Sequence, residues 1–302
     1  MANILIAGGS GLVGQRLSEL LTIKGYQVSW LSRNKNKDNP YATFEWGIQK
    51  GFIEAAAIEW ADYVVNLAGA GIADQHWTKN RKQHIIASRV ESAALLLEYF
   101  KKIKEPKAYL SASAIGYYGN RGDQLLSEQA SPGTGFLSKS CMAWEGAIDK
   151  VRETGIRTAT IRIGIVLSSQ GGALEKMLIP FRFFIGTYFG DGAQWYSWIH
   201  IDDLCRVFIR GIENEAMIDT YNAVAPHPET NKKLIKSIGQ ALQKSAIYQS
   251  TPAFVLRMGM GEMSHVVLDS AKASSAKIEA IGFKFEFPHL LPALKDLFDR
   301  EI

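Results

Sequence analysis

Cysteine is almost absent from this chain, since only Cys141 and Cys205 occur among its 302 residues. So few cysteines exclude a disulfide scaffold and favour a reducing compartment. No apolar run reaches the roughly 18 residues that a membrane-spanning helix needs. The first residues also lack the basic and long apolar stretches of a signal peptide. Together these absences predict a cytoplasmic protein without membrane contact.

A large excess of charge is missing as well. Lys and Arg total 34 against 30 acidic residues, which leaves a net charge of +4. That excess is too small to indicate nucleic-acid binding, and it suits an anionic small ligand equally well. The six histidines show no spacing typical of metal ligands, so no metal site is predicted. The G-x-S-x-G motif of serine hydrolases is absent too.

What the chain does contain is an alternation of short apolar runs with helical patterns. The predicted strands cover residues 3–7, 28–31, 43–46, 63–67, 108–112 and 158–163, and the predicted helices between them cover 13–24, 81–102 and 138–153. This alternation is typical of an α/β fold with a doubly wound parallel sheet of the Rossmann kind. After residue 166 the pattern is less regular, which indicates a smaller C-terminal α/β lobe.

The strongest motif is GGSGLVG at residues 8–14, directly after the first strand and at the start of the first helix. In a dinucleotide site Gly8 permits a tight turn, Gly11 lets the backbone approach the pyrophosphate, and Gly14 lets the helix pack closely on the strand. The helix N-terminus then offers free N–H groups to the phosphates. The predicted cofactor contacts in this loop are Gly8, Ser10, Gly11, Leu12, Val13 and Gly14.

Two further segments, together with Arg89, complete the predicted cofactor site. Ser32 and Arg33 end the second strand, where an acidic residue would bind the ribose 2′-hydroxyl but an arginine favours a 2′-phosphate. The cofactor predicted from this position is therefore NADP. Leu67, Ala68 and Gly69 follow the fourth strand, and their small size allows a flat ligand to pass close to the backbone.

These motifs together resemble those of the extended short-chain dehydrogenases/reductases. The resemblance rests on GGSGLVG, Asn66–Gly69, Ser111–Ser113 and Trp198–Leu204, in that order along the chain. It is closest to the atypical subgroup called epimerase family proteins, which are similar to NAD-dependent epimerases/dehydratases. That similarity is carried by Trp77-Thr78-Lys79, Ser88-Arg89-Val90, Ser113–Gly119, Trp144-Glu145, Tyr221–Pro226 and the tail from Gly261-Glu262-Met263 to Gly282-Phe283.

The resemblance implies a division of the chain into two domains. Residues 1–165 would form an NADP-binding Rossmann domain, to which 197–225 would return as late strands of the superfamily. Residues 166–302 would form a substrate-binding lobe. Within that lobe, 250–298 would be the small C-terminal domain of unknown function found in the subgroup.

The catalytic residues of the superfamily are only partly present. The superfamily uses a Ser, a Tyr-x-x-x-Lys pair and an Asn. Ser113 fits the Ser position, but the alignment places Leu137 at the Tyr position, Cys141 at the Lys position and Arg89 at the Asn position. Leu137 cannot transfer a proton and Cys141 supplies no positive charge, so the usual mechanism is not supported.

Several residues could replace the missing pair. Tyr117 or Tyr118, acting with Ser113, is our prediction for proton transfer, with Arg89 or Arg81 holding negative charge. Cys141 could act as a thiolate beside an arginine. Each residue also has an ordinary structural interpretation, namely packing for the tyrosines and Cys141 and a surface ion pair for Arg89.

The predicted substrate contacts are Arg81, Tyr117, Trp195 and Trp198, the last two from a glycine- and aromatic-rich segment at 186–198. Nearby, Asp202 and Asp203 fit the start of a helix as N-terminal cap and dipole partners.

Two functions remain open from the sequence. One is an NADP-dependent oxidoreductase or a nucleoside-diphosphate-sugar epimerase-like enzyme with a small, sugar-like substrate. The other is a catalytically idle NADP-binding protein that senses redox state or scaffolds a partner. The sequence gives no prediction of oligomeric state.

Overall fold

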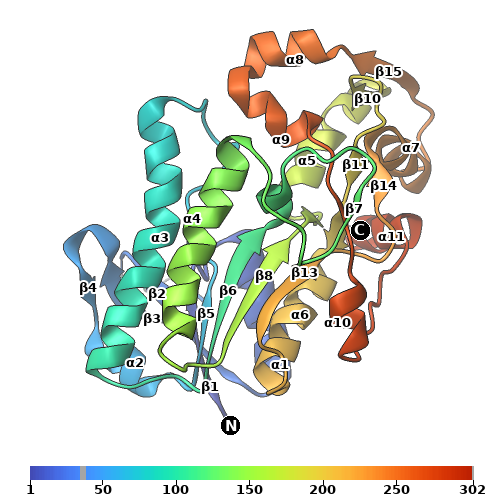
Figure 1. Ribbon diagram of the computed structural model, residues 1–302. Coiled ribbons are helices and arrows are strands. Elements are labelled where there is room, and N and C mark those ends of the chain that lie inside the picture. The colour runs from blue at the N-terminus through green and yellow to red at the C-terminus, as the bar shows by residue number, and fades with distance from the viewer. Residues whose placement is uncertain (35–38, 301–302) are drawn as a thin grey trace.

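The computed structural model describes residues 1–34 and 39–300, and its core is a central eight-stranded sheet (Figure 1). The strand order is β13-β8-β6-β5-β1-β2-β3-β4, and every neighbouring pair is parallel except β3 with β4. The strands are β1 (Asn3–Ala7), β2 (Gln27–Ser32), β3 (Ala42–Gly47), β4 (Phe52–Ile53), β5 (Tyr63–Asn66), β6 (Ala108–Ala114), β8 (Thr158–Ile163) and β13 (Asp219–Ala223). This arrangement confirms the predicted Rossmann-type α/β fold.

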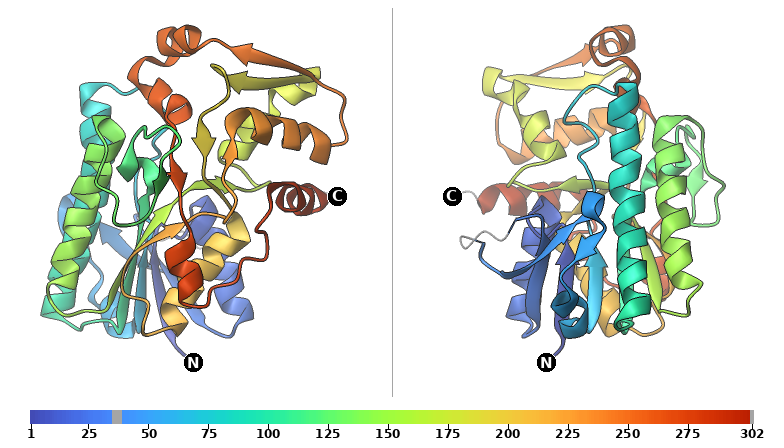
Figure 2. Two further views of the ribbon diagram at one scale, coloured as in Figure 1. Left: turned by 45° about the vertical axis from the view of Figure 1, so that its right-hand side comes forward. Right: turned by 90° about the vertical axis from the view of Figure 1, so that its left-hand side faces the viewer.

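Helices cover both faces of this sheet, as Figure 2 shows. Helices α3 (Lys79–Lys102) and α4 (Gly135–Arg152) pack together on one face, and α1 (Leu12–Ile23) and α6 (Ile201–Glu213) pack on the other. The short α2 (Ala55–Trp60) precedes β5. Strands covered on both faces require continuous apolar runs, and Ile4, Leu5 and Ile6 of β1 are fully buried.

A second layer of short elements lies over the carboxyl edge of the sheet (Figures 1 and 2). It contains the strands β7 (Leu125–Leu126), β9 (Ile165–Leu167), β10 (Ile185–Phe189), β11 (Trp195–Tyr196), β12 (Trp198–His200), β14 (Glu229–Thr230), β15 (Ile247–Thr251) and β16 (Lys272–Ala273), and the helices α5 (Ala173–Leu178), α7 (Asn231–Ala241), α8 (Ala253–Met260), α9 (His265–Leu268) and α11 (Leu290–Asp299). Helix α10 (Ala276–Ala280) lies lower, beside β13 at the edge of the sheet (Figure 1). The described residues also form four short 3-10 turns, which are η1 (Ile48–Lys50), η2 (Ile115–Tyr118), η3 (Pro180–Phe183) and η4 (Gly261–Ser264).

The chain returns to the main sheet late. Strand β13 pairs with β8 at the sheet edge, from Asp219 with Ala159 to Ala223 with Ile163. Strand β12, by contrast, pairs with β9 outside the main sheet. The limits of the two predicted domains stay a prediction.

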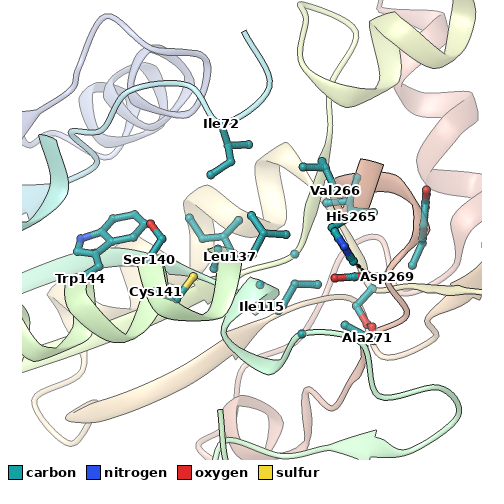
Figure 3. Close-up of a pocket in the computed structure, with 18 of the residues that line it drawn as sticks. Ile72, Ile115, Leu137, Ser140, Cys141, Trp144, His265, Val266, Asp269 and Ala271 are labelled. Carbon is teal, nitrogen blue, oxygen red and sulfur yellow. Dashed lines mark hydrogen bonds and ion pairs between the residues drawn. The ribbon is translucent and has the colours of Figure 1, made fainter. Parts of the chain in front are cut away.

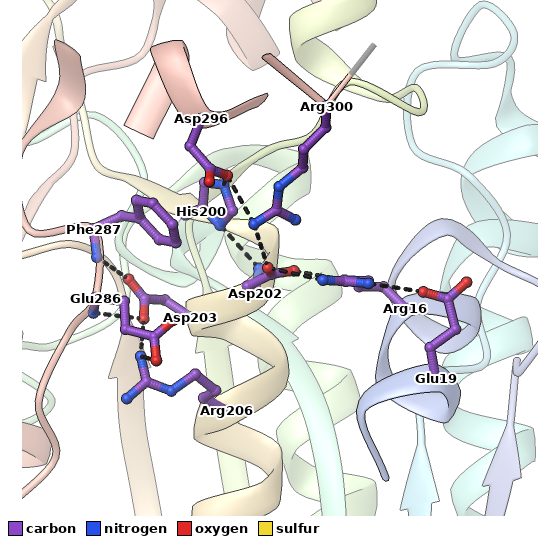
Figure 4. A network of polar contacts seen from close by, with 10 residues as sticks. All are labelled: Arg16, Glu19, His200, Asp202, Asp203, Arg206, Glu286, Phe287, Asp296 and Arg300. Carbon is purple, nitrogen blue, oxygen red and sulfur yellow. Dashed lines mark hydrogen bonds and ion pairs between the residues drawn. The ribbon is translucent and has the colours of Figure 1, made fainter. Parts of the chain in front are cut away.

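The start of α6 differs from the sequence interpretation. Its N-cap is His200, whose Nδ1 accepts the Asp202 backbone N–H at 3.1 Å. The Asp202 carboxylate instead accepts hydrogen bonds from Arg16 at 2.6 and 2.9 Å and pairs with Arg300 at 2.8 Å. Burial alone would raise the pKa of Asp202, but these arginines lower it to about 2. Asp202 therefore joins α1, α6 and the C-terminal helix (Figure 4).

Asp203 ties down the segment before α11. Its two carboxylate oxygens accept the backbone N–H groups of Glu286 and Phe287, each at 2.9 Å. Arg206, one turn later on α6, donates to the same carboxylate at 2.8 Å. The adjacent acids thus fix the C-terminal segment to the Rossmann sheet (Figure 4).

Candidate functional site

The glycine loop between β1 and α1 has the geometry of a phosphate cradle. Gly8 adopts φ +85°, a conformation that side chains disfavour. A Cβ at Gly14 would overlap the Gly8 carbonyl oxygen, so α1 packs directly on the turn. Gly11 is the N-cap without a side-chain cap bond, and the first turn of α1 carries no acid. The first N–H groups of α1 are therefore open to a phosphate, and the loop fits a dinucleotide pyrophosphate.

Strand register brings the other predicted cofactor residues beside this loop. Ala7 pairs with Leu31 of β2 on one side and with Asn66 of β5 on the other. The segments that follow, Ser32–Arg33 and Leu67–Gly69, therefore flank the glycine loop. A Cβ at Gly8 would lie only 2.9 Å from the Leu67 carbonyl carbon.

The remaining cofactor candidates follow the same edge. Ser10 and Arg33 are exposed, and Leu12, Val13 and Ser32 are half-buried. Ser32 Oγ donates to the Asn34 carbonyl at 2.8 Å. Among the residues that the structure describes, Arg33 makes no ion pair.

A pocket of about 220 Å³ lies between α4, η2 and the C-terminal segment (Figure 3). Its walls come from α3, from β6 with η2, from α4, from the β8–β9 junction, from β11 and from α9. The lining residues are Ile72, Arg89, Ala114, Ile115, Gly116, Gly119, Leu137, Ser140, Cys141, Trp144, Ile163, Gly164, Ile165, Trp195, Tyr196, Ser197, His265, Val266, Asp269 and Ala271. The C-terminal segment thus supplies one wall of the pocket.

Leu137 and Cys141 lie side by side in this pocket, one helical turn apart on α4. A Cβ at Gly116 would meet Leu137 Cβ at 3.4 Å and Cys141 Sγ at 3.7 Å. Burial raises the pKa of the Cys141 thiol to about 12, although Arg89 opposes the rise. Cys141 is therefore a neutral thiol near pH 7, which disfavours the thiolate role. Leu137 and Cys141 therefore give this part of the pocket an apolar lining.

Ser113 lies beneath the pocket rather than in its lining. Its Oγ donates to Glu145 Oε1 at 2.6 Å, and the serine is 2% exposed. Arg162 of β8 donates to both oxygens of Glu145, at 2.8 and 2.7 Å. Burial alone would lower the pKa of Arg162, but Glu145 raises it, so the guanidinium stays charged. Ser113 belongs to a buried ionic network.

Tyr118 extends this network. Its hydroxyl donates to Asn222 Oδ1 at 2.7 Å and accepts from Arg162 at 3.0 Å, and its side chain is fully buried. Burial raises the pKa of Tyr118, with Arg162 opposing. Tyr117 is half-buried and holds its ring 3.5 Å from the Arg162 guanidinium. The structure therefore brings Ser113, Tyr117 and Tyr118 together around Arg162, and none of the three lines the pocket.

The predicted substrate contacts separate into two groups. Trp195 lines the pocket and donates through Nε1 to Asp123 at 2.6 Å. Trp198 is fully buried in the core and donates to the His227 carbonyl at 3.0 Å. Arg81 lies behind the loop at 69–74, where it donates to the Gly71 carbonyl at 2.6 Å.

One pair in the pocket is missing from the sequence prediction. His265 Nδ1 contacts Asp269 Oδ1 at 2.8 Å, and both side chains line the pocket across from Leu137 (Figure 3). They are one turn apart on α9 and its end, a spacing that brings side chains together on a helix. The only sequence signal was this spacing, in a segment that nothing else connected to the pocket.

In the part of the chain that the structure covers, no helix is long and apolar enough to cross a membrane. Within the same residues, no group of three or more His, Cys, Asp or Glu side chains is placed to hold a metal ion.

Comparisons with known proteins agree with this geometry. Residues 4–224 match the model of the NAD dependent epimerase/dehydratase family, and residues 251–297 match a domain of unknown function, DUF1731. An epimerase family protein of Staphylococcus aureus (strain NCTC 8325 / PS 47) is 36% identical over 303 residues, which cover 98% of this chain and 99% of that protein.

Solved structures show the same relationship. The human epimerase family protein (isoform 2), crystallised with NADPH, has a TM-score of 0.89 and 29% identity, with 98% of this chain and 99% of that chain covered. A nucleoside-diphosphate sugar epimerase from Corynebacterium glutamicum has a TM-score of 0.80 and 31% identity, covering 98% of this chain but only 58% of that one. The chain described here therefore belongs to the NAD dependent epimerase/dehydratase family, and its glycine-rich cradle fits a pyridine nucleotide.

Proposed function

We propose that this protein is an NADP(H)-dependent oxidoreductase acting on a small substrate in the pocket between the sheet edge and the C-terminal segment. The observation that carries the proposal is the series of close contacts that leads from the glycine loop to the pocket lining. Gly8 touches Leu67 and Ala68, and Gly69 in turn touches Arg89, which lines the pocket. A dinucleotide with its phosphates on α1 can therefore reach the pocket with its other end.

NADP is favoured over NAD by the end of β2. Arg33 is exposed beside the glycine loop, and a guanidinium binds a 2′-phosphate through charge-assisted hydrogen bonds. NADPH in the related human structure supports the same choice.

Residues of the pocket have three proposed roles, which are to exclude water, to bind negative charge and to exchange a proton. When bound, the nicotinamide nucleotide supplies or accepts a hydride. Leu137, Cys141 and Trp144 keep water from that part of the pocket, and Arg89 holds negative charge on the substrate. The proton can be exchanged at His265 Nε2, because Nδ1 is oriented by Asp269. The second candidate for this proton exchange is Tyr117 or Tyr118, acting with Ser113.

Sugar-nucleotide epimerisation is the alternative that the related Corynebacterium glutamicum protein favours. A sugar needs many hydrogen-bond partners, whereas Ile72, Ile115 and Val266 are among the many apolar residues of this pocket. The apolar lining therefore argues for the oxidoreductase.

The test is a two-step assay on the whole chain. Calorimetric titration first measures NADPH binding, and NADPH consumption is then followed against small aldehydes, ketones, keto acids and UDP-sugars. We expect tight NADPH binding and consumption with a small carbonyl compound. Isomerised UDP-sugar without net NADPH consumption would support the epimerase, and binding without any turnover would support an idle NADP-binding protein.

A further inference from the structure

Arg89 brings a positive charge into the pocket without a carboxylate to neutralise it. Its guanidinium donates to the Ile85 carbonyl at 2.9 Å and lies 4.9 Å from the Trp144 ring. A Cβ at Gly69 would be 3.1 Å from its Cζ, so the group is closely packed. Burial lowers the pKa of Arg89, because a charged guanidinium is less stable away from water. No described carboxylate forms an ion pair with Arg89.

A second arginine, Arg81, lies close to Arg89 but has a carboxylate partner. Arg81 lies two turns earlier on α3, near enough that its charge also lowers the pKa of Arg89. Its side chain is 14% exposed and forms an ion pair with the exposed Asp74 at 3.6 Å, so the uncompensated charge is that of Arg89 alone. Arg81 Nε is buried and has no hydrogen-bond partner among the described residues. Uncompensated buried charge is unfavourable, and an anionic ligand would remove that cost.

The rest of the pocket limits what this anion can be. Most of the lining is aliphatic or aromatic, including Leu137, Trp144 and Ile165. The volume of about 220 Å³ is below the roughly 300–1,000 Å³ of sites for drug-sized ligands. The ligand is therefore small and mainly apolar apart from its charged group.

The phosphates of the cofactor are the competing source of negative charge. They already have a place at the open N-terminus of α1 and at Arg33, beside β1 and β2. Arg89 lies on α3 against Trp144 of α4 and lines the apolar pocket, whereas no residue of the glycine loop is among the lining residues described above. Its place in the pocket lining favours the substrate as the source of the anion.

We propose, building on the oxidoreductase function above, that the substrate is a small apolar carboxylate whose carboxyl group binds Arg89 in a bidentate ion pair. A planar guanidinium matches the two oxygens of a carboxylate. The apolar part of the substrate then lies against Leu137 and Trp144, and its reacting group faces the side of His265.

The probes for this proposal are phenylacetate and its neutral isostere phenylacetamide. Each is titrated into the whole protein with and without saturating NADPH, and binding is measured by calorimetry and by the fluorescence of pocket tryptophans. We expect phenylacetate to bind at least tenfold more tightly than phenylacetamide. Equal binding, or no binding of phenylacetate, would overturn the proposal without requiring any variant.

Variants identify the arginine. Arg89→Gln should weaken phenylacetate binding at least tenfold and leave NADPH affinity within about twofold. The phenylacetate affinity of Arg89→Lys should lie between those of the native protein and of Arg89→Gln. Arg182→Gln removes an exposed arginine of η3 and is the matched control, expected to change neither affinity. If Arg89→Gln instead weakens NADPH binding and spares phenylacetate, the anion belongs to the cofactor and the proposal fails. If the native protein does not bind NADPH, the proposed oxidoreductase function is wrong. The titrations of phenylacetate and phenylacetamide would still show whether the pocket binds a carboxylate.

Discussion

The two ends of the cleft are built in different ways. The cofactor end is one contiguous loop, Gly8–Gly14, with two strand ends placed beside it by parallel register. The pocket end draws its walls from segments between Ile72 and Ala271, and its floor rests on the buried Glu145–Arg162 pair. The cofactor end depends on the backbone geometry of one motif, whereas the pocket end depends on packing between segments far apart in the sequence. Damage to each end should therefore have a different signature.

The largest effect is expected from breaking the buried pair under the pocket. Glu145→Ala would leave the Arg162 guanidinium, 4% exposed, without its carboxylate. Removing one partner of a buried ion pair typically costs about 3–5 kcal/mol in the free energy of unfolding. Urea denaturation measures this loss.

The matched control is the surface pair of the same helix. Asp149 pairs with Arg152 at a side-chain exposure of 51%, so Asp149→Ala should cost less than about 1 kcal/mol. Equal losses in the two variants would contradict a structural role for the network.

The second prediction separates the two candidates for proton transfer. With a substrate found by the NADPH assay, His265→Gln should slow turnover by on the order of 10²-fold, because positioned acid–base groups contribute that much. NADPH affinity should not change, since His265 lies away from the glycine loop. Steady-state kinetics and calorimetry measure both quantities.

The same assay applied to Ser113→Ala, Tyr117→Phe and Tyr118→Phe gives the comparison. If one of these variants loses turnover while His265→Gln keeps it, the proton passes through the buried network and not through His265.

The third prediction concerns the cofactor end. A Cβ at Gly14 would overlap backbone atoms of Gly8 and Gly9, so Gly14→Ala should lower the free energy of unfolding by about 1–3 kcal/mol. Gly11 has room, with its nearest neighbour at 3.4 Å, so Gly11→Ala should chiefly weaken NADPH binding. Thermal unfolding and calorimetric titration distinguish the two losses.

Gly146 on α4 serves as the control for this pair. No atom lies within 4 Å of a Cβ built there, and the residue is exposed. Gly146→Ala should stabilise the protein by up to about 1 kcal/mol and leave NADPH binding unchanged. A Gly14→Ala variant that behaves like Gly146→Ala would show that the close helix contact is unimportant.

The smallest effect is a pH dependence of stability at the C-terminal clamp. Burial lowers the pKa of His200 to about 4, below its value of about 6.5 in the unfolded chain. Asp202 and Asp296 oppose this shift, and Arg300 adds to it. Between these values the unfolded chain binds the proton first, so stability should fall by roughly 1–2 kcal/mol from pH 7 to pH 5.

Urea titrations of the native protein and of His200→Gln measure this dependence. The variant should lose less stability over the same pH interval. An identical slope in both proteins would show that another group controls it.

The cofactor end and the pocket end also differ in how far the sequence alone predicts them. The alternating strands and helices of the Rossmann-type sheet depend on local patterns, so the sequence predicted the fold. The cofactor roles of the glycine loop and of Arg33 stay predictions. His265 and Asp269 reach the pocket only because the chain folds back over the sheet edge, which no local pattern encodes. Trp198 was expected at the substrate but lies in the core, because β12 pairs with β9 and turns its ring toward His227.

The departure from the superfamily motif stays a prediction of the sequence, and the surroundings of the residues involved come from the structure. Alignment alone placed Leu137 and Cys141 at the Tyr and Lys positions. Only the structure shows that the two side chains share one pocket with Arg89, and that Ser113 faces away from it toward Glu145.

The most direct test of the account is a calorimetric titration of NADPH and NADH into the native protein and Arg33→Ala. A bidentate contact with the 2′-phosphate predicts that NADPH binds at least about tenfold more tightly, since charge-assisted hydrogen bonds contribute roughly 1.5–3 kcal/mol. Arg33→Ala should remove most of that preference and leave NADH affinity unchanged. Equal affinities in the native protein, or a preference for NADH, would contradict the account.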